Sequence, residues 1–234
     1  MDAIEAARAV VDEHHPDALA AFLGGSVVTG RRTATSDLDI VVLLEGAPAP
    51  YRASLHYADW PVEMFVHTET TWHAYVEREL SKRRSPLLWM CAEGLLLFDI
   101  DGLGARLTAE ARKLTAAGPP LASAEEIDDR RYAITDLLDD LMGSSDQSER
   151  LFIATELVRR TGELALAIGG SWGGGGKWLA RRLETTAPGL SMRLHHGLRD
   201  VLNGRIEPLV DGVDEVLDQA GGRLWIGYRR TGTP

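Results

Sequence analysis

The stretch that decides the fold is GGSVVTGRRTATSDLDIVV, residues 24–42, which begins with two glycines and a serine and ends in an apolar run carrying two aspartates. In a β-strand, residues two apart project from the same face. Asp37 and Asp39 are therefore expected side by side, with Leu38 and Ile40 pointing into the core. Two like charges on one strand face repel each other. The pattern predicts a cation between them, and Mg²⁺ suits the position because it takes one or two carboxylates together with waters and phosphate oxygens.

The glycine end of the stretch predicts a phosphate site. A strand that stops at Gly24, Gly25 and Ser26 and then turns into a helix would expose backbone N–H groups and a hydroxyl to an anion. Arg31, in the following loop, either contacts a triphosphate or is a solvated loop charge. Ser36, at the end of the loop, is a further candidate for nucleotide binding. Together the two ends of the stretch predict binding of a metal-complexed triphosphate.

A Gly-Ser pair, ten further residues and then Asp-x-Asp, flanked by strands, resemble the signature of the DNA polymerase beta-like nucleotidyltransferase superfamily. The resemblance covers residues 19–67. It implies that Gly25 and Ser26 hold phosphate, while Asp37 and Asp39 bind two Mg²⁺ ions. The implied reaction transfers a nucleoside monophosphate from ATP or another NTP by in-line attack on the α-phosphorus, with pyrophosphate leaving.

That superfamily has a third metal-binding carboxylate on a neighbouring strand, and Glu63 in PVEMFVHT matches it. Asp59 does not match, because it precedes Pro61 in an expected turn. The alternative for Glu63 is an ordinary charge on a solvent-facing strand position.

The first half of the chain mixes helices with strands. Its expected elements are a helix over residues 3–15, strands within 19–26, 38–46, 61–68 and 95–102, and a helix over 70–82. A break follows where Pro119 and Pro120 cannot continue a helix, and Ser123 with Glu126 has the spacing of a capping box that starts the next one.

Beyond the break the sequence predicts helices alone. One apolar stripe at helical spacing contains Ile134, Leu137, Leu138 and Leu141. We therefore expect an α+β protein with a nucleotidyltransferase domain over residues 1–117, built on a small mixed β-sheet flanked by helices. A C-terminal helical bundle over residues 122–234 is expected to bind the acceptor substrate.

This order of domains is similar to that of kanamycin nucleotidyltransferase and related antibiotic-modifying enzymes, in which the first bundle helix carries a general base. The resemblance implies a small-molecule acceptor, such as an aminoglycoside-like antibiotic. Asp136, Asp139 and Asp140 lie opposite the apolar stripe and face either the metal site across a cleft or water. Asp139 best matches the position of the base, although the family has Glu there.

The composition limits the partners. A net charge of −10 and a pI near 5.2 argue against nucleic acid, whose binding needs clustered Lys and Arg. The same charge either attracts a small cationic acceptor or only keeps the protein in solution. The single cysteine, Cys91, excludes an internal disulfide. No apolar run reaches the length of a membrane span, so we expect a cytoplasmic protein without membrane contact, with a homodimer allowed.

Two other functions stay open. One is a protein-AMPylating enzyme of toxin–antitoxin type, although the bundle lacks the Arg-x4-His spacing of the partner ribonucleases. The other is a non-catalytic nucleotide-binding regulatory module, against which the three carboxylates argue. The run GGSWGGGGKW is not a P-loop, because Ser171 replaces its first glycine and Trp178 follows Lys177.

Overall fold

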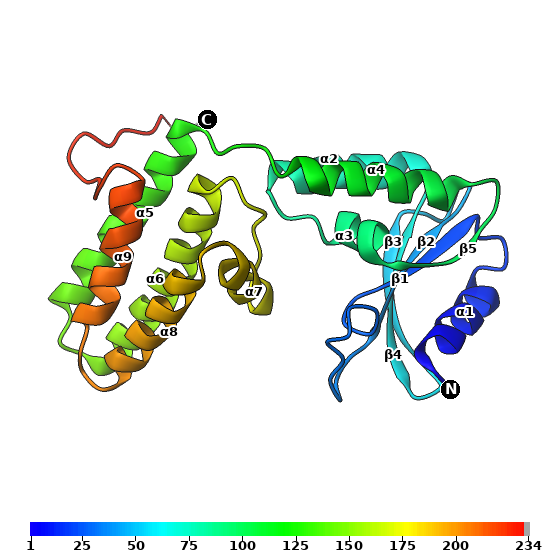
Figure 1. Ribbon diagram of the computed structural model, residues 1–234, viewed down its shortest axis with the longest axis horizontal. Helices are drawn as coiled ribbons and strands as arrows, with labels where there is room; N and C mark the ends of the chain where they lie inside the picture. Colours follow the sequence, from blue (N-terminus) through cyan, green and yellow to red (C-terminus); the bar gives the residue numbers. More distant parts are fainter. Residues whose placement is uncertain (232–234) are drawn as a thin grey trace. The chain divides into compact units, whose positions relative to one another are not determined.

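The computed structural model describes residues 1–231. It divides into two compact units, one covering Met1–Pro119 and one beginning at Pro120. The first unit is built on a five-stranded sheet with helices, and the described part of the second is helical (Figure 1). The predicted α+β class is confirmed.

The sheet has the strand order β3-β4-β2-β1-β5. Its strands are β1 (Ala20–Gly24), β2 (Leu38–Leu43), β3 (Tyr51–Tyr57), β4 (Trp60–His67) and β5 (Leu95–Asp99). The pairing of β2 with β4 is parallel, and the other neighbouring pairs are antiparallel. Four strands lie where the sequence predicts them. The edge strand β3 was not predicted, although its sequence YRASLHY alternates between half-buried and exposed residues.

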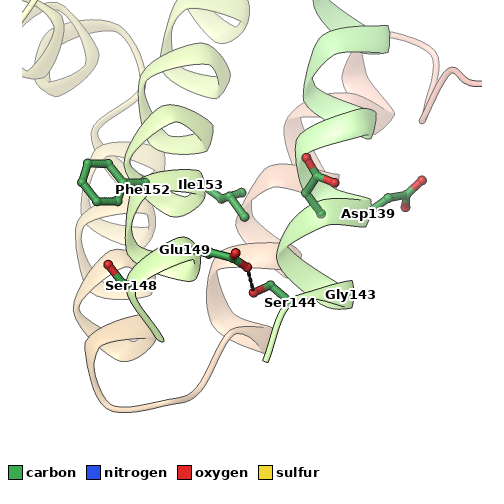
Figure 2. Close-up of a pocket in the computed structure, with 8 residues that line it drawn as sticks. Asp139, Gly143, Ser144, Ser148, Glu149, Phe152 and Ile153 are labelled. Carbon is green, nitrogen blue, oxygen red and sulfur yellow. Dashed lines mark hydrogen bonds between the residues drawn. The ribbon is translucent and has the colours of Figure 1, made fainter. Parts of the chain in front are cut away.

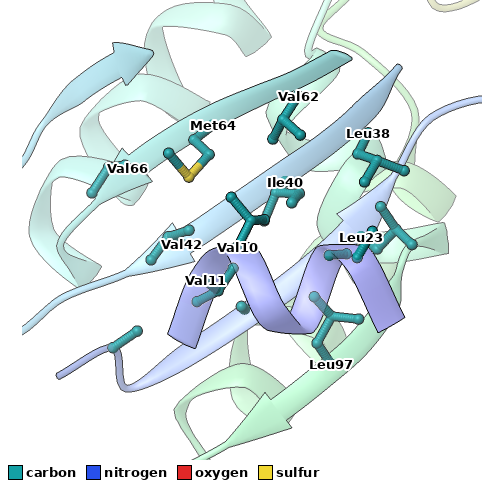
Figure 3. Packing of buried hydrophobic residues seen from close by; sticks show 14 of the residues in the cluster. Val10, Val11, Leu23, Leu38, Ile40, Val42, Val62, Met64, Val66 and Leu97 are labelled. Carbon is teal, nitrogen blue, oxygen red and sulfur yellow. The ribbon is translucent and has the colours of Figure 1, made fainter. Parts of the chain in front are cut away.

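One face of the sheet packs against α1 (Ala3–His14). The helix begins with a capping box between Asp2 and Glu5, and it buries an apolar side formed by Ala6, Ala7, Val10 and Val11. Figure 3 shows this helix lying across side chains from β1, β2, β4 and β5. Every second residue of β2, starting at Leu38, belongs to this core, so Asp39 points to the opposite face.

The opposite face packs against α2 (Glu69–Ser81), α3 (Pro86–Glu93) and α4 (Leu103–Ala117). At Gly24 a Cβ atom would lie 2.7 Å from Cγ of Met90, so any side chain at this position would require Met90 of α3 to shift. Three residues of the edge strand β3 are exposed, namely Arg52, Ser54 and His56, because α2, α3 and α4 do not cover this edge of the sheet. The face is therefore open to solvent beside Glu63.

The second unit contains five helices within its described residues. They are α5 (Ala124–Gly143), α6 (Gln147–Ile168), α7 (Lys177–Thr186), α8 (Pro188–Leu202) and α9 (Glu207–Gln219). The predicted capping box at the start of α5 is present, because Ser123 Oγ accepts from Glu126 N and Glu126 accepts from Ser123 N. The core contains the predicted stripe, with Ile134, Leu138 and Leu141 buried and Leu137 half-buried at its edge.

The buried His67 at the end of β4 predicts an acid-sensitive fold. Burial lowers its pKa from 6.5 to about 4, and its ring packs edge-on against Tyr75. The folded protein keeps the ring neutral, whereas the unfolded chain protonates it between pH 6.5 and about 4. The free energy of unfolding therefore keeps its full value above pH 6.5. It decreases as the pH falls from 6.5 to about 4, by at most about 1.4 kcal/mol per pH unit.

We expect the thermal midpoint to fall by several degrees between pH 7 and pH 5. His67→Gln should be less stable at pH 7.5 and should show a flatter decline below pH 6.5. His15, whose pKa burial also lowers, provides a comparison. Its Gln variant should flatten the decline less. Parallel declines for His67→Gln and the wild type would contradict the assignment to His67.

Candidate active site

A row of residues crosses four strands of the sheet and places the predicted carboxylates together. Ser54 on β3 pairs with Glu63 on β4, and Glu63 pairs in turn with Asp39 on β2. Asp39 pairs on its other side with Gly24 on β1. Directly paired residues project from the same face of a sheet. Asp37 precedes β2 by one residue, and one carboxylate oxygen from each of Asp37, Asp39 and Glu63 lies within 4.8 Å of the others.

These three residues, named here the acidic cluster, suit a divalent cation by their chemistry. All three are half-buried, so the charges are partly removed from water while one side stays accessible. Carboxylate oxygens are hard ligands of the kind that Mg²⁺ and Mn²⁺ prefer, and zinc sites more often contain Cys or His. The donor set fits the predicted Mg²⁺ and can hold the cation of a metal–nucleotide complex.

The turn after β1 lies directly against the acidic cluster. Gly25 has φ +76°, a conformation that side chains other than glycine rarely adopt. A Cβ atom on Gly25 would lie 2.1 Å from Oδ2 of Asp39, well inside contact distance. Glycine is therefore required at this position both by the backbone conformation and by the approach of the carboxylate.

The predicted helix after Ser26 is wrong. Residues 26–30 form successive turns, in which Thr29 N donates to Gly25 O at 3.3 Å and Arg31 N donates to Ser26 O at 3.1 Å. A second positive φ, +70° at Gly30, prevents a regular helix from continuing. The residues of this turn are half-buried or exposed, and no helix N-terminus lies at this position.

The predicted nucleotide-binding serines are joined to each other. Ser26 Oγ and Ser36 Oγ lie 2.7 Å apart, and Ser36 Oγ also accepts from Thr33 N at 2.8 Å. Ser36 is buried and closes the loop immediately before Asp37. Arg31 is exposed on the loop, whereas the next residue, Arg32, lies over the ring of Trp60 at 4.3 Å. The serine pair thus fixes both ends of the loop beside the acidic cluster.

Replacing Gly25 by Ala is expected to lower metal affinity and activity together. The added methyl group would force Asp39 aside, and a displacement of about 1 Å at a reacting site can cost about a hundredfold in rate. Gly30→Ala is the matched control, because Gly30 also has a positive φ but has nothing within 4 Å of its Cβ position. Titration with Mn²⁺ should show a loss for Gly25→Ala alone. Equal losses in both variants would mean that backbone strain, not contact with Asp39, causes the effect.

Sequence reasoning missed two residues that contact Glu63. Arg52 Nε donates to Glu63 Oε1 at 2.8 Å, and Ser54 Oγ makes a longer contact of 3.5 Å with the same oxygen. Both residues lie on β3. The alternation of YRASLHY is the signal that would have revealed them, because it places Arg52 and Ser54 on one face of a strand.

Asp139 lies on α5 in the second unit. Its side chain is 57% exposed, and Oδ1 is 3.9 Å from a terminal nitrogen of Arg223. Asp136 and Asp140 are exposed on the same helix. All three aspartates point away from the core of the bundle, as the sequence predicts.

An open hollow on the second unit includes two of these aspartates. Figure 2 shows it between α5 and α6, where Ser144 Oγ donates to Glu149 Oε2 at 2.7 Å. Phe152 on its rim is 76% exposed. Its lining residues are Asp139, Asp140, Gly143, Ser144, Ser148, Glu149, Phe152 and Ile153. Carboxylates beside an exposed aromatic ring are a surface that favours a cationic ligand.

The remaining sequence signals have structural explanations. Cys91 is buried, and burial raises the pKa of its thiol to about 12, so the thiolate needed for a nucleophile does not form at neutral pH. The glycine-rich run before Lys177 joins α6 to α7. Among the described residues, no helix is both long and apolar enough to cross a membrane.

A family model matches the part of the chain that contains this site. Residues 4–85 match the family model described as "Nucleotidyltransferase domain", a range that contains the Gly25 turn and the whole acidic cluster. One solved structure that resembles the chain is a nucleotidyltransferase-like protein from Exiguobacterium sibiricum, with 11% sequence identity and a TM-score of 0.45. The alignment covers 93% of this chain and 80% of that one. No curated protein matches the chain. The match over residues 4–85 supports the nucleotidyltransferase superfamily and nucleotidyl transfer as the activity of the first unit.

Proposed function

We propose that the protein is a Mg²⁺-dependent nucleotidyltransferase that moves a nucleoside monophosphate, AMP from ATP, to a hydroxyl of a small molecule. The observation that carries the proposal is the position of Asp39, which lies between Glu63 on one side and the Gly25 turn on the other. This arrangement brings three carboxylates close to the Gly25 turn within the region that matches the nucleotidyltransferase domain, which supports the proposal.

In the proposed reaction, different residues bind phosphate, bind the cation and accept the proton. The amides of Gly25 and Ser26 hold phosphate oxygens, and the acidic cluster holds the divalent cation that accompanies the triphosphate. When bound, this cation neutralises charge that develops on the attacking and leaving oxygens. The acceptor oxygen forms a bond to the α-phosphorus, and the bond from that phosphorus to the oxygen it shares with the β-phosphorus breaks, so that this oxygen leaves with pyrophosphate. The hydroxyl proton passes to Asp139 in this proposal.

The acceptor is proposed to be a cationic polyol of the aminoglycoside class, as in kanamycin nucleotidyltransferase-like enzymes. The net charge of −10 and the acidic hollow on α5 and α6 support a positively charged acceptor. In this proposal residues 1–117 form the catalytic domain and residues 122–234 form the acceptor domain.

A pyrophosphate-release assay tests the proposal. The chain is incubated with Mg²⁺ and each of the four NTPs, and the acceptors are aminoglycosides, lincosamides, transfer RNA and candidate protein partners. ATP with an aminoglycoside should give release that Asp37→Asn abolishes. Transfer to a protein alone would favour the AMPylating enzyme, and transfer to RNA alone would refute a small-molecule acceptor. Nucleotide binding without release for any acceptor would favour the regulatory module.

A further inference from the structure

The third carboxylate of the acidic cluster is held from the edge of the sheet. Arg52 on β3 donates through Nε to Oε1 of Glu63 at 2.8 Å, and a terminal nitrogen of the same guanidinium also contacts Oε1. Ser54 Oγ approaches this oxygen at 3.5 Å. The donors from β3 thus converge on one of the two oxygens of Glu63.

The register of the sheet explains why Arg52 reaches this oxygen. Ser54 lies directly opposite Glu63 across the antiparallel pair, and Arg52 lies opposite Phe65, two residues further along β4. A long side chain can reach its diagonal neighbour on the same face. The guanidinium carbon of Arg52 also lies 4.8 Å from the centre of the Phe65 ring. Two neighbours on β4 therefore fix the orientation of the guanidinium.

This ion pair contributes little to overall stability. The Arg52 side chain is 61% exposed, and exposed ion pairs are worth little because water and salt screen them. Glu63 is more enclosed, with 20% of its side chain exposed. The consequence of the contact is geometric, since the donors from β3 hold Oε1 and leave Oε2 as the oxygen of Glu63 that can be presented to a cation.

We propose that Arg52 is a positioning residue for the metal site, which holds Oε1 of Glu63 so that Oε2 is presented to the divalent cation. The proposal rests on the proposed function, because it requires the acidic cluster to bind that cation. Residues that hydrogen-bond to metal ligands commonly change metal affinity by about tenfold to a hundredfold when they are replaced.

The direction in which metal affinity changes when Arg52 is replaced distinguishes a positioning role from a purely electrostatic one. An arginine that acted only through its charge would repel the nearby cation, so its removal would tighten metal binding. An arginine that orients Glu63 strengthens binding, so its removal weakens it. The two roles therefore give opposite results in the same measurement.

The experiment titrates Mn²⁺ alone into the full chain, without nucleotide, and follows binding by calorimetry and by the electron paramagnetic resonance of free Mn²⁺. Arg52→Ala should weaken Mn²⁺ affinity by about tenfold. Arg52→Lys keeps the charge but loses the pair of nitrogens that meet Oε1, and should be weakened nearly as much. Arg78→Ala is the matched control, because Arg78 is an exposed arginine 4.1 Å from a Tyr75 ring on α2, and it should bind like the wild type.

A double-mutant cycle with Glu63→Gln tests whether Arg52 changes Mn²⁺ affinity through its contact with Glu63. In the Glu63→Gln background, Arg52→Ala should cause no further loss of Mn²⁺ affinity. Unchanged or tighter binding by Arg52→Ala, or an equal loss in both backgrounds, would overturn the positioning role. In that case the proposed metal site would still be supported if the wild-type chain binds Mn²⁺ and the Asp37→Asn variant does not. A wild-type chain that binds no Mn²⁺ would refute the metal site and the role of Arg52 together.

Discussion

Replacing Asp37 by Asn is expected to slow nucleotidyl transfer by about a thousandfold or more while the first unit keeps its fold. The amide has the shape of the carboxylate but lacks the charge that holds the cation. A bound metal ion contributes several kcal/mol to the stabilisation of the transition state, and each 1.36 kcal/mol corresponds to a factor of ten in rate. Single-turnover release of pyrophosphate at saturating ATP and Mg²⁺ measures the loss.

Asp59 provides the matched control for this variant. It is an exposed aspartate in the turn between β3 and β4, and Asp59→Asn should retain activity. Without metal, Asp37→Asn should melt at the same temperature as the wild type or higher, because the substitution removes one of three like charges that lie within 4.8 Å. Undiminished turnover of Asp37→Asn would refute the role of the acidic cluster in catalysis.

Replacing Asp139 by Ala is expected to lower kcat by a factor of about a hundred to ten thousand. These are the factors by which a positioned general base usually accelerates a reaction. Asp139 is not expected to bind ATP or metal, so the KM for ATP and the affinity for Mn²⁺ should stay at wild-type values. A loss confined to kcat at saturating acceptor would assign the residue to proton transfer.

Two neighbours on α5 test the choice of Asp139. Asp136 and Asp140 are exposed aspartates of the same helix, and their Ala variants should keep a near wild-type kcat at saturating acceptor. Normal activity of Asp139→Ala with loss in one of the neighbours would move the base to that residue. If all three variants are active, these carboxylates are surface charges, and the search for the base should begin at Glu63.

Much of the first unit could be predicted because β4 alternates between buried and less buried residues along most of its length, and β2 begins in the same way. The buried residues of β2 and β4 predict which face each strand presents to α1, and that choice places Asp39 and Glu63 on the opposite face. The capping box at Ser123 was equally local, since the hydrogen bonds join residues three apart. Signals of this kind depend on near neighbours in the sequence, so no knowledge of the tertiary fold is needed.

Other features depend on information that the local pattern lacks. The turns after Ser26 replaced the predicted helix because Gly25 and Gly30 both adopt positive φ, which the one-letter sequence permits but does not require. The contact between Arg52 and Glu63 depends on the register of β3 with β4. That register is set by the two-residue turn at Ala58 and Asp59. The sequence pattern did not predict β3, so it could not predict this register.

The pairing of Gly24 with Asp39, and of Asp39 with Glu63, also determines which changes of length the chain can accept. Deleting one residue within β2 would turn the carboxylate of Asp39 toward the face that α1 buries, because side chains alternate with a period of two. An insertion among residues 29–35, which are all exposed, would leave both pairings unchanged. In a diverging lineage, insertions and deletions should therefore accumulate in this loop and be eliminated from β2.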